Sequence, residues 1–381
     1  MRNIFKNYTQ KIDFIDKILE NDYIPNKKEL KRLYILGKEK DAGIRLDVTE
    51  ALGIRYTPQN EKYLLNMTYD KDNLVRVGAV EALSVGRKKE TLSRLKNLFT
   101  DNNYMIRGYA VNSYFNVWVN RYGYNVENMR KYRKKIHKYK KLEKNKWVQA
   151  SYEKADYIAG NQEGLNNIIH KIRSYTGDDY HVFSALVNSA KAIRNIWNAA
   201  EINKELKSVL NIIPRCYLVD DIKEFINSTE YPRVLILDNS NTGLSQLLEF
   251  LGNYLYYYNL FYSAGIQPGK KINSDLIELI QNSYSVNIER YQYPKRMNNI
   301  WNKQFIVPIG VEIGDELFPF QKVIHIFEHM GEECLSIEKG KEMLNKIISE
   351  ICRECSTEGI QFDSQSIFIP ASNEKEPDLL D

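Results

Sequence analysis

The chain has 381 residues, which exceeds the length of one typical domain and allows substantial buried cores. With 43% apolar and 27% charged residues it has the composition of a globular protein. No apolar run approaches the length of a membrane span, and the N-terminus lacks the apolar core of a signal peptide. The four cysteines are too few for a disulfide framework, so we expect a cytosolic protein with no membrane partner.

An internal repeat occupies the first half of the chain. Arg45, Arg76 and Arg107 recur at intervals of 31 residues, each within a similar apolar pattern. A fixed period in this range, built from helical patterns, indicates a helical solenoid. Each unit contains a first helix such as 89–99, a polar turn and a second helix such as 103–117.

A polar residue precedes each repeated arginine by four positions: Asp41, Asp72 and Asn103. We expect this residue to cap the second helix of its unit. The arginine, one turn later, is predicted to pair with an acidic group of the adjacent unit and not to be catalytic. Two weaker copies begin near residues 147 and 179. These units resemble short HEAT repeats, and the resemblance implies an extended concave surface.

Positive charge is concentrated at residues 130–146, where ten Lys or Arg stand against one Glu. This segment contributes about +9 to a net charge of +5, so the remainder carries about −4 and the basicity is local. Tyr132, His137, Tyr139 and Trp147 are interleaved, as phosphate contacts combined with base stacking would require. The candidate nucleic-acid contacts are Arg130, Arg133, Lys134, Lys138 and Lys141. The alternative is a solvated helix whose Tyr and Ile side chains face the adjacent repeat.

From residue 231 onward, short apolar runs alternate with helical patterns, which is typical of an α/β domain with a parallel sheet. A strand at 234–237 leads into a loop of small residues, and a helical pattern begins at Ser245. Such a loop can direct backbone N–H groups and the positive end of a helix at an anion. The predicted anion-loop residues are Asn239, Ser240, Asn241, Thr242, Gly243 and Ser245.

The order of these elements resembles the low-molecular-weight protein tyrosine phosphatase and arsenate reductase superfamily. Tyr-Ser-Ala-Gly at 262–265 matches a turn of the family, 272–288 matches its next helix and exit loop, and Lys295-Arg296-Met297 follows. The segments 306–312 and 323–327 would supply the last two strands. The resemblance covers about 125 residues and implies a four-stranded parallel sheet of the phosphatase I type.

The resemblance also locates the family's reactive groups, and this chain carries other residues at those positions. The family's loop is Cys, five residues, Arg and then Ser or Thr. Asp238 stands at the cysteine position and Leu244 at the arginine position, whereas Asn241 and Ser245 are retained. The family's Asp-Pro acid corresponds to Glu328-His329, and the extra reductase cysteine corresponds to 308–310. We therefore predict neither reductase nor ordinary phosphatase chemistry.

Asp238 admits two interpretations. Its carboxylate is anionic like a thiolate, so the loop N–H groups would stabilise it, and it would fill the cradle and repel a phosphate. We predict this inert, self-filled loop. The alternative is a hydrolase with Asp238 as nucleophile and Glu328 as acid. A strand followed by Asp also begins the Asp-x-Asp-x-Thr phosphatases, but Ser240 replaces their second carboxylate.

Two further candidates have structural interpretations. Cys352 and Cys355 have metal-like spacing, but no second pair exists, and the surrounding apolar pattern predicts core-facing positions on a final helix. His325 alternates with Ile324 and Ile326, which predicts a packing or hydrogen-bonding role within a strand. We expect no metal and no cofactor.

We predict a multidomain chain, an α-helical HEAT-like solenoid followed by an α/β domain with a four-stranded parallel sheet. The predicted segments are a helical repeat domain at 1–205 with a basic insertion at 124–146, a connection at 206–230, a degenerate phosphatase-like domain at 231–358 and a tail at 359–381. The expected function is non-catalytic: a bacterial interaction or regulatory protein that binds a protein partner through the concave surface. The alternatives are a hydrolase that uses Asp238 and nucleic-acid binding through the basic insertion.

Overall fold

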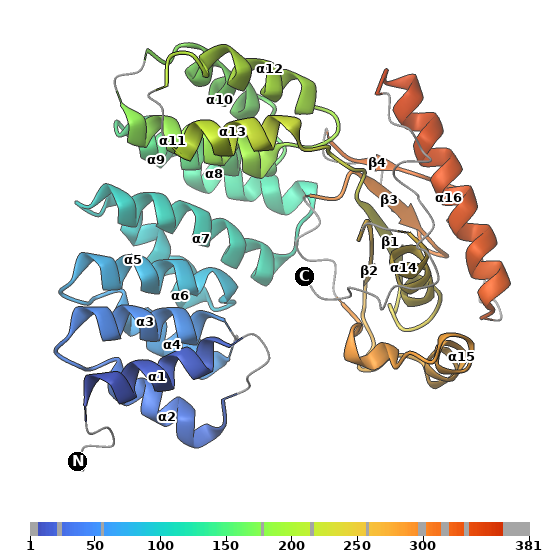
Figure 1. The fold of residues 1–381 in the computed structure, drawn as a ribbon, viewed down its shortest axis with the longest axis horizontal. Coiled ribbons are helices and arrows are strands. Elements are labelled where there is room, and N and C mark those ends of the chain that lie inside the picture. Colours follow the sequence, from blue (N-terminus) through green and yellow to red (C-terminus); the bar gives the residue numbers. More distant parts are fainter. Residues whose placement is uncertain are drawn as a thin grey trace. The chain divides into compact units, whose positions relative to one another are not determined.

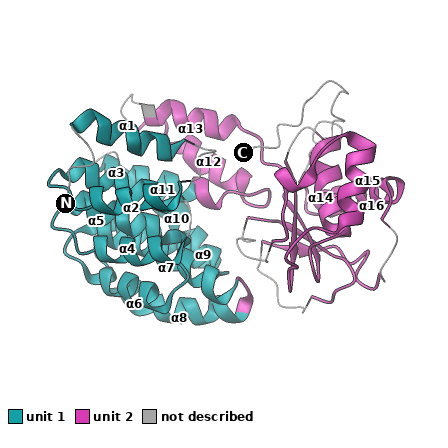
Figure 2. Cartoon of the chain, turned by 90° about the horizontal axis from the view of Figure 1, so that it is seen from below, with its two compact units in different colours: residues 1–123, 127–190 teal, residues 124–126, 191–381 magenta. Residues whose placement is uncertain are grey.

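The computed structural model describes residues 7–20, 25–54, 57–176, 179–213, 217–256, 259–295, 302–313, 320–330 and 335–360. The chain divides into two compact units, residues 1–123 with 127–190 and residues 124–126 with 191–381 (Figures 1 and 2). The described ranges contain sixteen α-helices and a four-stranded parallel sheet. The predicted fold class, a helical region followed by an α/β region, is confirmed.

The first unit consists of helices in chain order (Figure 1). They are α1 (Tyr8–Leu19), α2 (Lys27–Leu36), α3 (Ala42–Gly53), α4 (Pro58–Met67), α5 (Asn73–Ala82), α6 (Lys89–Asn97), α7 (Tyr104–Tyr122), α8 (Val126–Leu142), α9 (Lys146–Ile158), α10 (Glu163–Arg173) and most of α11 (Tyr180–Ile193). The helices α1, α3, α5, α7 and α9 contact one another in succession, and α2, α4, α6 and α10 pack beside members of that row. Among the described helices, none combines the length and apolar character needed to cross a membrane.

The predicted helix caps are confirmed. The side chains of Asp41, Asp72 and Asn103 accept hydrogen bonds from backbone N–H groups in the first turns of α3, α5 and α7. Asn145 and Asp179 do the same at α9 and α11. Each bond satisfies one of the N–H groups that a helix start leaves without a partner, which explains why the polar residue recurs with the repeat.

The predicted arginine pairs are also confirmed. Each repeated arginine meets an acid that stands two residues before the next cap: Arg45 with Asp70 at 2.8 Å, Arg76 with Asp101 at 3.6 Å and Arg107 with Glu143 at 2.8 Å. The guanidinium groups also donate to carbonyls of the turn that precedes their own helix. The acids in turn accept from the backbone N–H of the following cap. One arginine therefore connects two successive turns.

The second unit contains the sheet. Its elements are α12 (Ala199–Val209), α13 (Tyr217–Asn227), β1 (Val234–Asp238), α14 (Leu244–Leu255), β2 (Phe261–Gly265), α15 (Ser274–Tyr284), β3 (Phe305–Pro308), β4 (Lys322–Val323) and α16 (Ile337–Thr357). The strands lie in the order β2-β1-β3-β4, and every pair is parallel. Because β1 is central and its Val, Leu and Ile side chains are buried, the residue that follows it lies at the carboxyl edge of the sheet.

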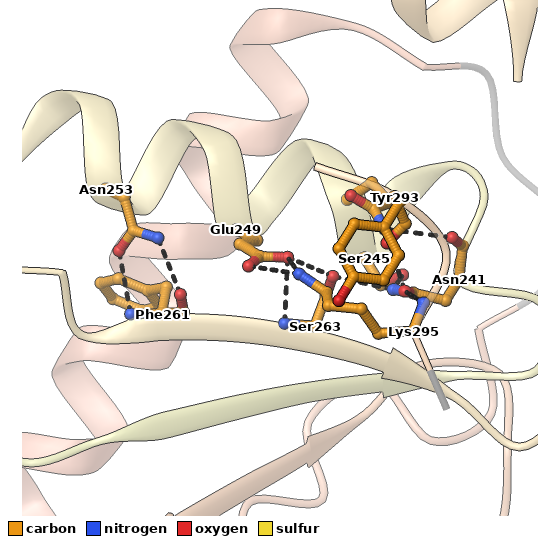
Figure 3. A network of polar contacts seen from close by, with 9 residues as sticks. Asn241, Ser245, Glu249, Asn253, Phe261, Ser263, Tyr293 and Lys295 are labelled. Carbon is orange, nitrogen blue, oxygen red and sulfur yellow. Dashed lines mark hydrogen bonds and ion pairs between the residues drawn. The ribbon is translucent and has the colours of Figure 1, made fainter. Parts of the chain in front are cut away.

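The helix α14 covers β1 and β2, and α16 packs against α14. Close approach to β2 requires glycine at position 252, since a Cβ there would lie 2.4 Å from the ring of Phe261. The amide of Asn253 bonds both the backbone N–H and the backbone carbonyl of Phe261, at 3.0 and 2.8 Å (Figure 3). These contacts hold the last turn of α14 against the start of β2.

The last two strands are shorter than predicted. The strand β3 ends at Pro308 instead of continuing to 312, because Gly310 adopts a left-handed φ of +60° that turns the chain. The strand β4 contains only Lys322 and Val323, and a single bridge joins Ile309 to Phe327. The prediction of a strand position for His325 is therefore wrong. His325 lies in an exposed turn that its hydrogen bond to Glu328 closes.

We predict that Arg45→Ala lowers the free energy of unfolding of the first unit by about 3 kcal/mol, because it leaves the half-buried Asp70 carboxylate unpaired. The matched variant Arg76→Ala should cost about 1 kcal/mol, since that pair is longer and more exposed. Urea denaturation followed by far-UV circular dichroism measures both. Equal losses in the two variants would contradict the account.

Candidate functional site

The predicted anion loop lies between β1 and α14, at the carboxyl edge of the sheet. The helix begins at Leu244, one residue before the predicted start, and Leu244 is half-buried. Asn239 is exposed, whereas Asn241 and Ser245 are fully buried. The structure thus brings the predicted loop residues together, but the side chains of Asn241 and Ser245 are buried in the protein interior.

The carboxylate of Asp238 occupies the loop's own cradle. One of its oxygens accepts a hydrogen bond from the backbone N–H of Asn241 at 2.5 Å. Burial raises the pKa of Asp238 above its ordinary value, although hydrogen bonds from the Ser245 hydroxyl and from backbone N–H groups, those of Ser240 and Ser245 among them, act to lower it. The donors that would receive an external anion are therefore directed at a side chain of the protein.

Asn241 is the centre of the hydrogen-bond network around the loop (Figure 3). Its backbone has a left-handed φ of +50°, a conformation that Asn tolerates better than most residues. Its side-chain amide donates to the hydroxyls of Ser245 at 3.0 Å and Ser263 at 2.8 Å. Its side-chain oxygen accepts from Nε2 of Gln246 at 2.9 Å and from the backbone N–H of Lys295 at 2.7 Å. One buried side chain thereby ties the loop to α14, β2 and the segment near 295.

A buried ion pair lies next to this network. Glu249 on α14 accepts from the backbone N–H of Ser263 at 3.1 Å and forms a short contact with the Ser263 hydroxyl. Nζ of Lys295 lies 2.5 Å from the Glu249 carboxylate (Figure 3). The sequence reasoning missed Glu249 and Gln246. Both are polar residues in an otherwise apolar stretch of α14, and a buried polar residue of this kind is a signal that could have identified them.

The outer side of the loop is closed by the chain that follows β2. The backbone N–H groups of Ile266, Gln267, Gly269 and Asn273 donate to the carbonyls of loop residues 238, 239, 240 and 242. The hydroxyls of Ser240 and Thr242 bond each other at 2.9 Å. The hydroxyls of Ser240 and Thr242 thus bond each other within the loop, and the loop's backbone carbonyls accept hydrogen bonds from the chain that follows β2.

Glu328, the other candidate catalytic residue, does not join Asp238. Glu328 follows the bridge residue Phe327, and β3 lies between β4 and β1. Two strand spacings, about 10 Å in total, therefore separate Glu328 from Asp238. A hydrogen bond from His325 at 2.8 Å lowers the pKa of Glu328. Position 308–310, where the resemblance implies a further cysteine, forms the end of β3 and the Gly310 turn.

The cysteine pair lies on α16, as predicted. Cys355 is buried, and burial raises the pKa of its thiol to about 12, which disfavours the thiolate form. Cys352 is partly buried. No group of three or more His, Cys, Asp or Glu in the described residues is arranged to hold a metal ion. Cys216, Cys334, Arg296, Met297 and the tail from 361 lie outside the described residues.

The basic segment forms α8, and its apolar side packs against α7. Tyr132 is fully buried against Tyr114, Phe115 and Trp118, and Ile136 is buried beside it. The interpretation in which Tyr and Ile face the adjacent repeat is confirmed for these two residues. Tyr132 is consequently not available to stack on a nucleic-acid base, which corrects that part of the nucleic-acid hypothesis.

The five candidate nucleic-acid contacts divide between two sides of α8. Arg130, Arg133, Lys134 and Lys141 line a groove of about 650 Å³ that α8 forms with α9 and α10. Lys138 is exposed but does not line it. His137 also lines the groove, whereas Tyr139 packs against Phe99.

Comparisons with known proteins were made on the whole chain. No protein-family model matches it, and no curated protein matches it. A solved structure that matches is a thioredoxin-dependent arsenate reductase from Corynebacterium glutamicum, Cg_ArsC1'. The match covers 61% of this chain and 96% of that chain, at 16% identity and a TM-score of 0.28. A TM-score of 0.28 does not establish a shared fold, and the α/β unit is defined by its own strand order β2-β1-β3-β4.

We predict that Asn241→Ala destabilises the α/β unit by about 3 to 4 kcal/mol, because it removes four buried hydrogen bonds and places alanine at a positive φ. The matched variant Asn239→Ala changes an exposed neighbour and should cost less than about 0.5 kcal/mol. Thermal unfolding followed by near-UV circular dichroism separates the two. A small loss in Asn241→Ala would show that the loop does not depend on this side chain.

Proposed function

We propose that this chain is a non-catalytic interaction protein, in which the helical repeats bind a protein partner and the α/β unit is a phosphatase-like domain without turnover. The observation that carries the proposal is the Asp238 carboxylate, which accepts the Asn241 N–H at 2.5 Å inside the loop. An anion cradle of backbone N–H groups works because it is positive and empty. A cradle that holds its own carboxylate offers a phosphate neither property.

Several features oppose the alternative in which Asp238 is a nucleophile. A nucleophilic carboxylate must be directed at the substrate, whereas an oxygen of the Asp238 carboxylate is bonded to the Asn241 N–H within the loop. Leu244 supplies no charge where the resembled family has its arginine. Lys295 is engaged by Glu249, and Glu328 is bonded to His325 two strand spacings away.

The partner surface that we propose is the row of second helices in the first unit. Glu50 on α3 and Glu81 on α5 occupy equivalent positions nine residues after their caps, and both are exposed. Partial burial, followed by the charge of Glu50, raises the pKa of Glu81, so the two carboxylates lie within electrostatic reach of each other. A partner that covers this row would therefore present basic groups.

We predict that the wild-type protein binds no orthophosphate at millimolar concentration, whereas Asp238→Ser combined with Leu244→Arg does. The double variant removes the competing charge and supplies a guanidinium that can bond an oxyanion with two N–H groups. Isothermal titration measures binding, and Asp238→Ser combined with Leu244→Met is the uncharged control. Orthophosphate binding by the wild type, or aryl-phosphate turnover that disappears in Asp238→Ala, would contradict the proposal.

We also predict that immobilised protein retains one stoichiometric protein partner from an extract of its source, and that Glu50→Lys combined with Glu81→Lys reduces retention at least tenfold. The matched control is Glu90→Lys, which changes an exposed carboxylate on the first helix α6 and should retain the partner. Quantitative mass spectrometry of the retained protein measures the effect. Equal retention by the two variants would show that another surface binds.

A further inference from the structure

The helix α8 presents two cationic faces with different surroundings. Its buried side chains Met129, Tyr132 and Ile136 are spaced three and four residues apart and fix the rotation of the helix. Arg130, Arg133, Lys134 and Lys141 then face the groove toward α9 and α10. The cations on the other face do not line the groove: Lys131, Lys135 and Lys138. The helix therefore carries cations on two faces, four of them along the groove and three away from it, and Lys131 of the second set pairs with Glu127 at 2.6 Å.

The floor of the groove is electrically compensated. Glu153 and Asp156 of α9 are buried, and Nζ of Lys140 lies 2.8 and 2.7 Å from their carboxylates. Further donors are Lys171 and Asn167 to Glu153, and Asn161 to Asp156. Two buried carboxylates thus meet two lysines and two amides. A buried network of this kind is stable only when every member is paired. Because the two carboxylates are already paired within the floor, they do not neutralise the cations on the groove rim.

Three of the rim cations on α8 lack that compensation. Within the described ranges, Arg133, Lys134 and Lys141 form no ion pair with an acidic side chain, although each is near the compensated floor. On the side formed by α9 and α10 the groove is also lined by Gln149 and Glu163, whose side chains can accept hydrogen bonds. One wall of the groove is therefore cationic, and the other offers acceptors.

We infer that this groove binds the phosphate backbone of a single nucleic-acid strand. The phosphates would lie along the cationic wall, while the sugar hydroxyls and exocyclic amino groups would donate to Gln149 and Glu163. Inorganic polyphosphate shares the anionic character but offers no donors to Gln149 and Glu163, whereas an acidic peptide offers backbone N–H donors but no phosphates, and both serve as competitors in the test. This role is additional to partner binding by the helical row and does not depend on it.

The dimensions of the groove suit a short strand. From Arg130 to Lys141 the helix rises about 16 Å, the length of about five nucleotides, so its four groove cations can reach about four phosphates. Because the aromatic side chains of this region are used for packing, base stacking contributes little to binding. We expect affinity in the micromolar range, little dependence on base sequence and a strong dependence on salt.

The test is fluorescence anisotropy of the full chain with labelled single-stranded RNA and DNA of twelve mixed nucleotides, between about 50 and 200 mM KCl. The wild type should bind with a salt slope of about −2 to −3, which corresponds to about four phosphates. Arg133→Ala, Lys134→Ala and Lys141→Ala together should weaken binding at least tenfold and flatten the slope by about two. The control triple Lys131→Ala, Lys135→Ala and Lys138→Ala removes the same charge and should weaken binding less than about threefold.

A second variant guards against loss of folding in the first. Lys134→Glu combined with Lys141→Glu changes two exposed residues and should abolish binding while far-UV circular dichroism stays unchanged. A preference for RNA over DNA would show that Gln149 and Glu163 accept hydrogen bonds from the 2′-hydroxyl, whereas equal binding would show that they accept from the bases. Either result supports the inference. Absence of wild-type binding, equal effects of the two triple variants, or tighter binding of polyphosphate or polyglutamate of equal charge would overturn it.

Discussion

The shape of the loop after β1 depends on one buried side chain, that of Asn241. Four hydrogen bonds connect it to Ser245, Ser263, Gln246 and the backbone of Lys295, and together they hold its backbone at a positive φ. A non-glycine residue in that conformation costs on the order of 1 kcal/mol, which these bonds offset. The loop is therefore fully built from the protein's own groups and needs no bound anion to keep its form.

Because the loop is held by the protein's own groups, the Asp238 carboxylate can take the place of an external anion. Loops that bind phosphate leave their N–H groups directed at empty space, whereas here the Asn241 N–H is directed at a carboxylate of the same loop. The nearby Lys295 is paired with Glu249, so it does not supply a free compensating charge for a substrate at Asp238. The groups that hold the loop are present, whereas the reactive cysteine and arginine that the resemblance would imply are Asp238 and Leu244 in this chain. Our proposal of a binding role for the α/β unit, without turnover, rests on that distribution.

The parts of the structure that the sequence predicted are those set by local geometry. The caps Asp41, Asp72 and Asn103 followed from spacing, because a cap and its helix start lie within a few residues. The arginine pairs were predictable as a class, but their acids lie 25 to 36 residues away, and only the fold identifies Asp70 or Glu143. The Lys295–Glu249 pair, 46 residues apart, and the turn at Gly310 had no local signal strong enough to predict them. The two faces of α8 required knowledge of which side packs on α7.

The central claim is that Asp238 fills the anion cradle, and NMR titration of its carboxyl carbon tests that claim most directly. The account predicts one titration with a pKa above the ordinary value for Asp, because burial outweighs the hydrogen bonds to the carboxylate. It further predicts that the amide resonances of Ser240, Asn241 and Ser245 follow this titration and do not move when orthophosphate is added. A saturable phosphate-dependent shift of these amides, or an Asp238 pKa at or below its ordinary value, would contradict it.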